Sequence, residues 1–372
     1  MLIANAILAV MLAACDGAPA LPVWQVSSFE EPAEIGNYNV TVRLGDEKAD
    51  TVSHIKFEAE RCASPLISLK AGEFLDYTWT YRVKGPIIKS DKSEPKLKVE
   101  VYVEGADGLE ANPAGKNTRS PAVDVKPCDA RVIYLIGDST VTDQKGGIYA
   151  SWGQALPMMV KPGWTVANYA LSGRSLQRAK QEGTRGLILD NIKPNDFVLI
   201  QMGHNDQKRF ARVKEGKEPS YLTLLNEYID MLEAKGAKVV LVTPVERRRF
   251  EKDGSQGGKT LVEFRKWVMG TAELRGLPCI DLNEKSYVMM GKLGAEGSKK
   301  TQCYLAGKKD DTHHSLYGAY LNARIIADGL AKIDDVKDAI KDEYREYDYT
   351  NPLPDPGFPI TSKINDQKPE GN

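Results

Sequence analysis

The sequence predicts an α/β protein in which a doubly wound parallel sheet follows an antiparallel β-sandwich. Between about residues 21 and 128, apolar and polar residues alternate along several short stretches, which is typical of half-buried antiparallel strands. From residue 131 to residue 349, short apolar runs alternate with segments of helical spacing, which is typical of a parallel sheet covered by helices. The chain of 372 residues is long enough for both domains.

Residues 1–15, MLIANAILAVMLAAC, form a short apolar run that ends at Cys15. The run resembles a bacterial lipoprotein signal, in which Cys15 would become the lipidated first residue. It is too short to span a bilayer comfortably as a permanent helix. We therefore expect export to the periplasm or the cell surface, with a lipid anchor on Cys15 as the only membrane contact. No Lys or Arg precedes the run, which leaves a start upstream of Met1 open, and a buried first helix is the alternative.

Composition and cysteine spacing limit the possible partners and cofactors. The formal net charge is -1 and the pI is about 6.5, so no overall basic field favours nucleic acid as a partner. No CxxC or His-rich spacing suggests a metal site, and we expect neither a metal nor another cofactor. An exported protein can form disulfides, but the sequence does not select a pairing among Cys62, Cys128, Cys279 and Cys303.

In the first region, the alternation is clearest in the stretches YNVTVRL, IKFEAE, YTWTYRV and LKVEVYV. In YNVTVRL, for example, Val40, Val42 and Leu44 alternate with Thr41 and Arg43. Polar, Gly-rich or Pro-containing segments connect these stretches, as turns between antiparallel strands require. Several such strands, each with one buried face, predict a β-sandwich.

In the second region, five apolar runs predict the strands of the parallel sheet: VIYLI, VANYA, DFVLIQM, KVVLVTP and LPCIDL. The clearest helix between them is SYLTLLNEYIDMLEAKG, in which Leu225, Ile229 and Leu232 share one face and Gly236 gives a C-terminal stop. Residues 350–372 are rich in Pro and polar residues, which predicts a draped or mobile tail.

Polar clusters follow the first, second, third and fifth predicted strands. They are GDST at 137–140, NYALSGRS at 168–175, GHND at 203–206 and DDTHH at 310–314. Because parallel strands bring their carboxyl ends to one edge of a sheet, we expect the clusters to meet there. Each cluster alone also fits a turn or a helix cap, but their joint occurrence in this order favours a catalytic site.

The residue types in these clusters predict nucleophilic catalysis by Ser139. A serine hydroxyl is a poor nucleophile until an imidazole accepts its proton, and a carboxylate must fix the tautomer of that imidazole. Of the four histidines, one lies in the sandwich region and one follows another strand, which leaves His313 and His314 as candidate bases. Asp310 precedes His313 by three residues and Asp311 precedes His314 by three, so the spacing leaves both pairs open.

A tetrahedral oxyanion also requires preorganised hydrogen-bond donors. The Ser139 N–H, the Gly173 N–H and the Asn205 side-chain amide are the candidates. Glycine suits the second position because its backbone can approach a substrate closely. Aromatic rings can stack on sugars and arginines can hold a uronate carboxylate, although ordinary core or surface roles are the alternative for each. The candidate sugar-binding residues are Trp152, Arg174, Gln207, Arg247 and Arg248.

Several motifs resemble the sequence blocks of the SGNH (GDSL) hydrolases: GDSTVTDQ, SWGQALP, NYALSGRS, GHND and DDTHHSLYGA. Their residues are most similar to those of the rhamnogalacturonan acetylesterase branch. The resemblance covers about residues 131–333 and implies a flavodoxin-like three-layer fold. It implies that Ser139 is the nucleophile, His313 the general base and Asp310 the carboxylate that orients it. Gly173 and Asn205 would complete the oxyanion hole. The family pattern Asp-x-Thr-His selects Asp310 and His313 over Asp311 and His314.

The strand rhythm and placement of residues 21–128 resemble the galactose-binding-like β-sandwich that precedes the esterase domain in some bacterial members of this family. The sequence leaves open whether this domain binds carbohydrate, binds calcium or supports the catalytic domain structurally.

The resemblance implies a serine esterase that removes O-acetyl groups from a plant cell-wall polysaccharide, with rhamnogalacturonan, a pectin, as the first expectation. An esterase of the same fold that acts on acetylxylan or another acetylated glycan is the nearest alternative. A lipid or thioester hydrolase is a further alternative, although no long apolar lid is evident. From a different class, the chain could be a surface glycan-binding lipoprotein with an inactive esterase domain.

Overall fold

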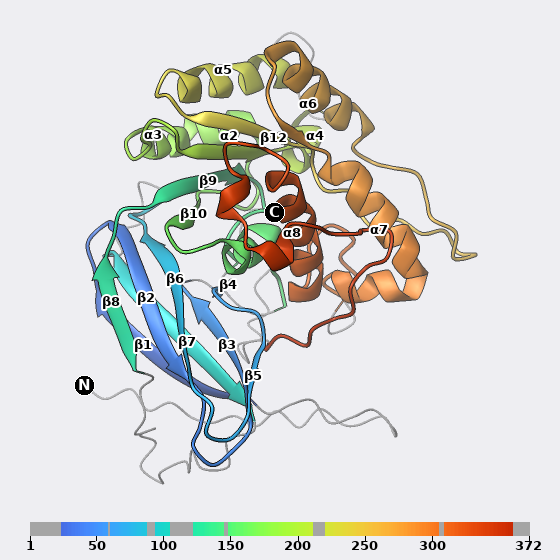
Figure 1. The fold of residues 1–372 in the computed structure, drawn as a ribbon. Helices are drawn as coiled ribbons and strands as arrows, with labels where there is room; N and C mark the ends of the chain where they lie inside the picture. The colour runs from blue at the N-terminus through green and yellow to red at the C-terminus, as the bar shows by residue number, and fades with distance from the viewer. Residues whose placement is uncertain are drawn as a thin grey trace.

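The computed structural model describes residues 24–58, 60–87, 94–104, 122–144, 148–210, 220–304 and 309–359. A strand-rich N-terminal region lies beside an α/β region (Figure 1). The predicted signal segment with Cys15 lies outside the described residues, as does the end of the predicted tail from residue 360.

The N-terminal region consists of two antiparallel sheets that share one core. The first sheet has the order β1-β7-β3-β4, with β5 paired to β3, and the second has the order β6-β2-β8. Val40 and Val42 of one sheet and Val99 and Val101 of the other are buried in the core between them, so the predicted sandwich is confirmed. The strands are β1 (Gln25–Pro32), β2 (Gly36–Leu44), β3 (Thr51–Phe57), β4 (Arg61–Cys62), β5 (Ile67–Leu69), β6 (Leu75–Val83), β7 (Lys96–Glu104) and β8 (Val123–Pro127).

The sandwich differs from the sequence prediction at the end of β3. The alternation in IKFEAE continues to Glu60, but β3 ends at Phe57. Glu58 and Glu60 have φ of 53° and 58°, in the left-handed region that non-glycine residues rarely adopt. The chain therefore turns at Glu58 instead of continuing as a strand.

The second region contains a five-stranded parallel sheet of order β10-β9-β11-β12-β13. In chain order this is 2-1-3-4-5, the order of the flavodoxin-like doubly wound sheets. Each predicted apolar run overlaps one of these strands, so the predicted sheet is confirmed. The strands are β9 (Arg131–Gly137), β10 (Trp164–Asn168), β11 (Phe197–Gln201), β12 (Lys238–Val242) and β13 (Cys279–Ile280).

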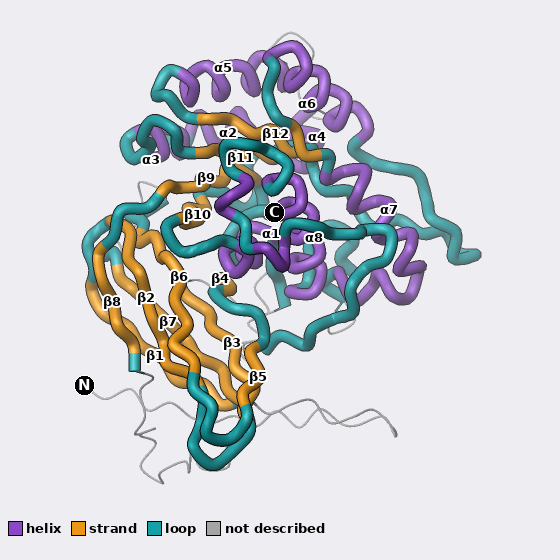
Figure 2. Tube along the Cα trace, viewed as in Figure 1, coloured by secondary structure: helices purple, strands orange, loops and turns teal. Residues whose placement is uncertain are grey.

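Helices cover both faces of this sheet (Figure 2). Alternate residues of β9 bury into two separate cores, with Ile133 and Leu135 in one and Tyr134 and Ile136 in the other. Helices α1 and α8 pack in the first core and α2, α5 and α6 in the second. The helices are α1 (Trp152–Ala155), η1 (Leu156–Met159), α2 (Leu176–Gln181), α3 (Thr184–Leu189), α4 (His204–Phe210), α5 (Tyr221–Glu233), α6 (Val262–Arg275), α7 (Leu282–Gly297), η2 (Ser298–Thr301), α8 (Leu316–Leu330), η4 (Lys337–Ala339) and η5 (Asp342–Tyr344).

Helix α5 shows how the local sequence sets an element. Ser220 caps its N-terminus, where the hydroxyl accepts a hydrogen bond from Thr223 N at 3.1 Å. The predicted apolar face is buried, including Leu225 and Ile229. The helix ends at Glu233, and Gly236 follows with a φ of 76°, which glycine adopts without strain.

The described part of the predicted tail, residues 350–359, contains neither helix nor strand and lies against both regions. The Tyr317 hydroxyl of α8 donates to Leu353 O at 2.6 Å. From the sandwich, Lys56 Nζ donates to Pro359 O at 2.7 Å, and the Phe358 ring is buried beside this contact.

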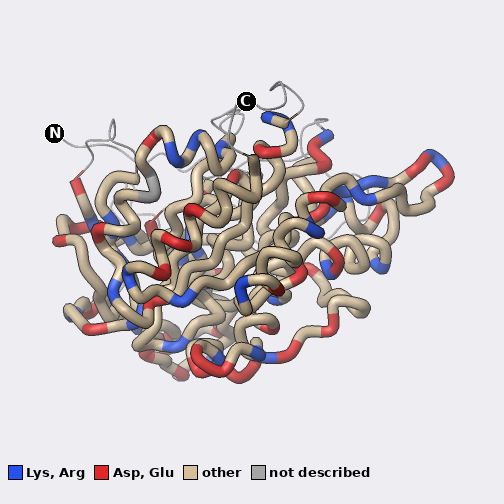
Figure 3. Tube along the Cα trace, turned by 90° about the horizontal axis from the view of Figure 1, so that it is seen from above, with Lys and Arg blue, Asp and Glu red and all other residues tan. Residues whose placement is uncertain are grey.

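Within the described residues, Cys62, Cys128, Cys279 and Cys303 are all free thiols. The same part of the chain contains no group of three or more His, Cys, Asp or Glu side chains arranged to hold a metal ion. None of its helices is long and apolar enough to cross a membrane. Basic and acidic residues are interspersed along the trace rather than separated onto opposite faces (Figure 3).

The packing of α8 against η2 predicts a stability effect at Gly318. A Cβ at this position would stand 2.0 Å from Thr301 O, whereas a Cβ at Gly270 in α6 would meet nothing within 4 Å. We expect Gly318→Ala to lower the free energy of unfolding by about 1–3 kcal/mol, because the backbone of η2 must move. The matched Gly270→Ala should raise it by up to about 1 kcal/mol, because alanine favours the helix. Urea titrations of both variants test this, and equal effects would contradict the packing argument.

Candidate active site

The sheet order brings together the loops that carry the predicted site residues. Strand β9 lies between β10 and β11, so the loops after these three strands are neighbours at one edge. Ser139 follows β9, and Gly173 lies between β10 and α2. Asn205 is the second residue of α4, the helix that follows β11. In sheets of this order, ligands bind at this switch point between the first and third strands.

Ser139 lies at the tip of a tight turn that follows β9. The amides of Val141 and Thr142 both donate to Asp138 O at 3.0 Å, which closes the turn immediately after the strand. A Cβ at Gly137 would lie 2.5 Å from a methyl group of Val141, so this turn requires glycine at the end of the strand. The turn leaves the Ser139 side chain 6% exposed at the edge of the sheet.

The Asp138 side chain fixes the conformation of this turn. Its Oδ1 accepts hydrogen bonds from Thr140 N at 3.0 Å and from Thr140 Oγ1 at 2.8 Å. Its Oδ2 lies 3.3 Å from Nδ1 of His204, which is the first residue of α4. Complete burial alone would raise the pKa of Asp138, but the charge and hydrogen bond of His204, together with Thr140, outweigh it and lower the pKa to about 2. The GDST turn is therefore tied to the GHND loop through a buried carboxylate.

His313 connects Ser139 to Asp310. Its Nε2 lies 2.9 Å from Ser139 Oγ, and its Nδ1 lies 2.8 Å from Asp310 Oδ2. The other oxygen of Asp310 accepts from the backbone amides of Thr312 at 2.9 Å and His313 at 3.0 Å. Burial opposes ionisation of Asp310, but the hydrogen bonds and charge of His313 lower its pKa to about 2. An ionised carboxylate at Nδ1 holds the ring proton there, which leaves Nε2 to accept the serine proton.

The alternative pair, Asp311 and His314, has different neighbours. His314 is 2% exposed, and its pKa falls to about 3 because of its burial and then because of the charge of His313. Asp311 pairs instead with Arg248, at 3.3 Å. The structure therefore places His313, and not His314, against Ser139.

The two loops that carry the predicted oxyanion donors touch each other. Gly173 has a φ of 75°, in the left-handed region that favours glycine. The Asn205 amide donates to Arg174 O at 3.3 Å, which links the first turn of α4 to the residue after Gly173. Gly173 and Asn205 thus lie in the segments that follow β10 and β11, the two neighbours of β9 in the sheet.

Three of the predicted sugar-binding residues are half-buried: Arg174, Gln207 and Arg247. Arg247 Nη1 donates to Gln207 Oε1 at 2.9 Å and to Thr260 Oγ1 at 3.0 Å. Arg174 instead forms an ion pair with Glu182 at 2.7 Å. Of these two arginines, Arg247 has no carboxylate at ion-pair distance among the described residues.

The structure corrects the predictions for Trp152 and Arg248. Trp152 is 1% exposed, and its indole N–H donates to Gln201 Oε1 at 2.8 Å inside the core. Arg248 is 5% exposed and donates from Nε to Ser298 Oγ at 2.9 Å and from Nη2 to Ala295 O at 2.5 Å. Neither side chain is available to a sugar, because partners that are distant in the sequence hold both in the interior.

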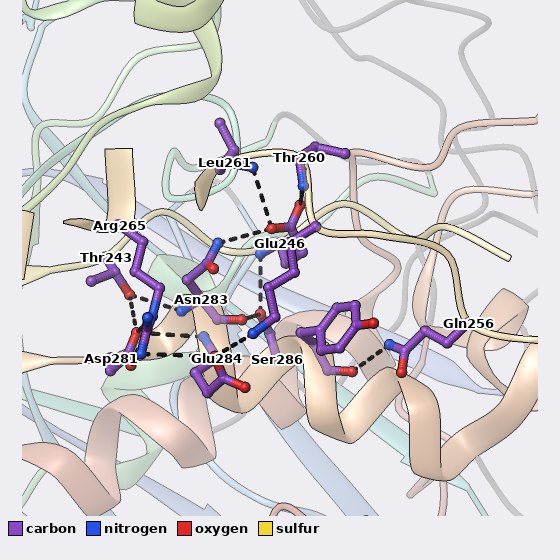
Figure 4. Close-up of polar contacts among 12 residues, drawn as sticks. Thr243, Glu246, Gln256, Thr260, Leu261, Arg265, Asp281, Asn283, Glu284 and Ser286 are labelled. Atoms are coloured by element: carbon purple, nitrogen blue, oxygen red, sulfur yellow. Dashed lines mark hydrogen bonds and ion pairs between the residues drawn. The ribbon is translucent and has the colours of Figure 1, made fainter. Parts of the chain in front are cut away.

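Arg247 is held by a buried carboxylate that the sequence analysis did not single out. Glu246 is 1% exposed, and its Oε1 accepts from Arg247 N at 2.9 Å and from both the backbone and the hydroxyl of Thr260. Its Oε2 lies 3.2 Å from Asn283 Nδ2 (Figure 4). The same threonine hydroxyl accepts from Arg247 Nη1, so this network fixes both the backbone and the side chain of the arginine.

Asp206, in the GHND motif, is a second residue whose role was not predicted. It is fully buried, and its Oδ1 accepts from Leu176 N at 3.0 Å, which joins the loops after β10 and β11. Its Oδ2 has no hydrogen-bond partner among the described residues. Burial, with a smaller contribution from the charge of Asp138, raises the pKa of Asp206 to about 7.

This raised pKa predicts a pH-dependent stability. Because the folded-state pKa of about 7 lies above the ordinary value of 3.8, the folded protein binds this proton more tightly than the unfolded chain does. The resulting stabilisation is complete below pH 3.8 and is lost as the pH rises through about 7. Asp206→Asn keeps an acceptor for Leu176 N and stays neutral. We expect the difference in free energy of unfolding, Asp206→Asn minus wild type, to increase by up to about 1.4 kcal/mol per pH unit between pH 5 and pH 7.

Urea titrations at pH 5, 6, 7 and 8 measure this difference. The exposed Asp334→Asn is the control, because it removes the same charge without affecting a buried group. A difference between Asp206→Asn and wild type that does not change with pH would contradict the buried-proton argument.

Comparison with known proteins is consistent with the fold and the motifs. Residues 135–315 match the GDSL-like Lipase/Acylhydrolase family. The rhamnogalacturonan acetylesterase RhgT of Bacillus subtilis is 34% identical over 212 residues, which cover 54% of this chain and 90% of that protein. The probable rhamnogalacturonan acetylesterase YesY of the same organism is 34% identical over 214 residues, which cover 55% of this chain and 94% of that protein.

A solved structure shares the overall fold. The crystal structure of the YxiM protein from Bacillus subtilis superimposes with a TM-score of 0.50 at 22% identity, covering 82% of this chain and 80% of that one. Identity to RhgT along nearly all of its length establishes the family independently of the fold. The chain therefore belongs to the GDSL-like lipase/acylhydrolase family and is a carboxylic ester hydrolase.

Proposed function

We propose that the protein is a carbohydrate acetylesterase that removes O-acetyl groups from rhamnogalacturonan through an acyl-enzyme on Ser139. The observation that carries the proposal is the hydrogen-bonded chain from Ser139 through His313 to Asp310. The similarity to RhgT and YesY, which are named as rhamnogalacturonan acetylesterases, supports the choice of substrate.

In the first step, Ser139 Oγ attacks the carbonyl carbon of the acetyl group and gives its proton to His313 Nε2. The carbonyl oxygen becomes an oxyanion, which accepts hydrogen bonds from the amides of Ser139 and Gly173 and from the Asn205 side chain. The bond to the sugar oxygen then breaks, and that oxygen takes the proton from His313. The products are a free sugar hydroxyl and acetyl-Ser139.

In the second step, water attacks acetyl-Ser139 while His313 Nε2 accepts its proton. A second oxyanion forms at the same place, and the Ser139 oxygen leaves as it regains the proton from His313. Acetic acid leaves and ionises to acetate in solution, and the enzyme returns to its starting state. Throughout, Asp310 stays ionised, because its pKa is about 2, and stabilises the imidazolium that forms twice in each cycle.

The charge near the site supports an acidic polysaccharide. The Arg247 side chain donates to the uncharged Gln207 and Thr260 and forms no ion pair within the described residues, which supports a role of this cation in binding a uronate carboxylate. Rhamnogalacturonan carries such carboxylates in its backbone, whereas a plain xylan backbone does not. Acetylxylan and other acetylated glycans are the alternative substrates. An inactive, glycan-binding esterase domain is disfavoured by the intact contacts of Ser139, His313 and Asp310.

We also propose that the protein is exported and anchored by a lipid on Cys15. The apolar run that ends at Cys15 supports this proposal. It would place the enzyme at the periplasm or the cell surface, where it can meet polysaccharide.

Acetate release from acetylated rhamnogalacturonan and acetylated xylan, measured side by side, tests the proposed activity. We expect the wild type to prefer rhamnogalacturonan, and Ser139→Ala to lower kcat by on the order of 10⁶-fold while the fold is kept. Circular dichroism and the melting temperature check that the variant is folded. Acetate release by Ser139→Ala at the wild-type rate would exclude Ser139 as the nucleophile, and preference for xylan would favour the alternative substrate.

The proposed oxyanion hole predicts a rate effect at Asn205. We expect Asn205→Ala to lower kcat by about 10²–10³-fold with little change in KM, because the lost donor acts mainly on the transition state. Lys208→Ala, at an exposed position on the same helix, is the control. An unchanged kcat for Asn205→Ala would remove this side chain from the oxyanion hole.

A further inference from the structure

Two cations from the β-sandwich are buried against the esterase region. The Arg61 side chain, on β4, is 0% exposed, and the Lys84 side chain, just after β6, is 3% exposed. Arg61 Nη2 donates to Val166 O at 2.5 Å, and Lys84 Nζ donates to Asn168 O at 2.8 Å. Both carbonyls belong to β10, the strand next to β9 in the parallel sheet.

The same two cations hold a carboxylate in the nucleophile loop, which we define as residues 137–144. Asp143 lies four residues after Ser139. Its Oδ2 is 3.1 Å from Lys84 Nζ, and its Oδ1 is 3.6 Å from Arg61 Nε. Burial of Arg61 favours its neutral form, but the charges of Asp143 and then Glu58 outweigh this and raise its pKa. Charged side chains of the sandwich therefore bind directly to the loop that carries Ser139.

Glu58 completes the cluster and balances its charge. Its carboxylate lies 3.1 Å from Arg61 Nη1 and 3.4 Å from Lys84 Nζ, so two cations face two carboxylates. Glu58 has a φ of 53°, which is costly for a residue with a Cβ. Two cations with both carboxylates in place form a neutral and largely buried group, in which the Glu58 side chain is 27% exposed, whereas loss of one member leaves an unpaired charge.

A second set of hydrogen bonds connects this cluster to Ser139. Asn168, whose carbonyl Lys84 binds, donates from Nδ2 to Asp143 Oδ1 at 2.8 Å and to Val141 O at 2.7 Å. Within the loop, Gln144 Nε2 donates to Ser139 O at 2.9 Å. We therefore expect a shift of Asp143 or Asn168 to reach the backbone at Ser139 and at Val141.

We propose that the β-sandwich positions the nucleophile, and that Lys84 and Arg61 are positioning residues which hold the loop of Ser139 in line with His313. This inference rests on the proposed role of Ser139. It assigns the sandwich a function within the catalytic cycle, through contacts that do not require the sandwich to bind sugar. Small displacements of a reacting group reduce the rate strongly, so loss of these contacts lowers kcat more than it changes KM.

The chain offers a matched control at the same interface. Lys341, just before η5, is a lysine whose Nζ donates to the Tyr77 hydroxyl of β6 and to Met158 O, both at 2.8 Å. It joins the two regions as Lys84 does, but its partners lie outside the nucleophile loop. Lys341→Met therefore removes a comparable contact between the regions without releasing Asp143.

The experiment uses the full chain and p-nitrophenyl acetate, with kcat and KM determined well below the melting temperature of each variant. We expect Lys84→Met to lower kcat by about 10- to 100-fold with KM nearly unchanged. We expect Lys341→Met to leave kcat within about twofold of the wild type, even where both variants melt earlier. Lys84→Arg, which keeps the charge, should recover part of kcat.

A double-mutant cycle with Asp143→Asn provides the second measurement. The effects of Lys84→Met and Asp143→Asn on kcat should not multiply, because each breaks the same contact. Equal losses in Lys84→Met and Lys341→Met, or independent effects in the cycle, would overturn the inference. Ser139→Ala in the same assay separates the two proposals: if it keeps activity, the proposed nucleophile fails, and if it is inactive while Lys84→Met matches the wild type, only the positioning role fails.

Discussion

A parallel sheet brings the carboxyl ends of all its strands to one edge, and every feature of the candidate site depends on this constraint. With β9 between β10 and β11, three loops meet without any long excursion of the chain. Side chains in one loop then bind the backbone or side chains of the next. Asp138 contacts His204, Asn205 binds Arg174 O, and Asp206 binds Leu176 N. The loops are therefore fixed by one another as well as by the strands that they follow.

Aspartates at this edge show how the surroundings of one residue type decide its chemistry. Asp138 and Asp310 each have a histidine partner and backbone donors, and the pKa of each is about 2. Asp206 has a backbone donor on one oxygen only and no histidine at hydrogen-bond distance among the described residues, and its pKa is about 7. The difference follows from whether burial is offset by an adjacent positive partner. Only the ionised Asp310 is in contact with the base that Ser139 requires.

The sequence predicted those features that depend on local pattern. Apolar runs located all five strands of the parallel sheet, and the capping serine and apolar face located α5. Strand ends located the residues that the structure brings together at one edge, including Ser139 and His313. Strands β1, β4, β5 and β8 were not among the stretches singled out, and β4 and β5 contain only two and three residues, too few to show alternation.

Features that depend on distant partners could not be predicted from the sequence. Trp152 and Arg248 were expected at the substrate because of their residue types and their nearness to the motifs. Their burial depends on Gln201 and Ser298, which lie about 50 positions away in the sequence and give no local signal. The same holds for Asp143, which reads as an ordinary loop residue.

The contacts of Arg61 and Lys84 also bear on how the two regions can move. Dispersion contacts across an apolar interface are individually weak and have no preferred direction. Displacement of a largely buried ion cluster, in contrast, separates charges in a medium that screens them poorly. Arg61 and Lys84 reach the backbone of β10 as well as Asp143, so movement of the sandwich would pull on a strand and on a loop at once. We therefore expect the two regions to behave as one body in catalysis, with the rigid edge of the parallel sheet extended into the sandwich.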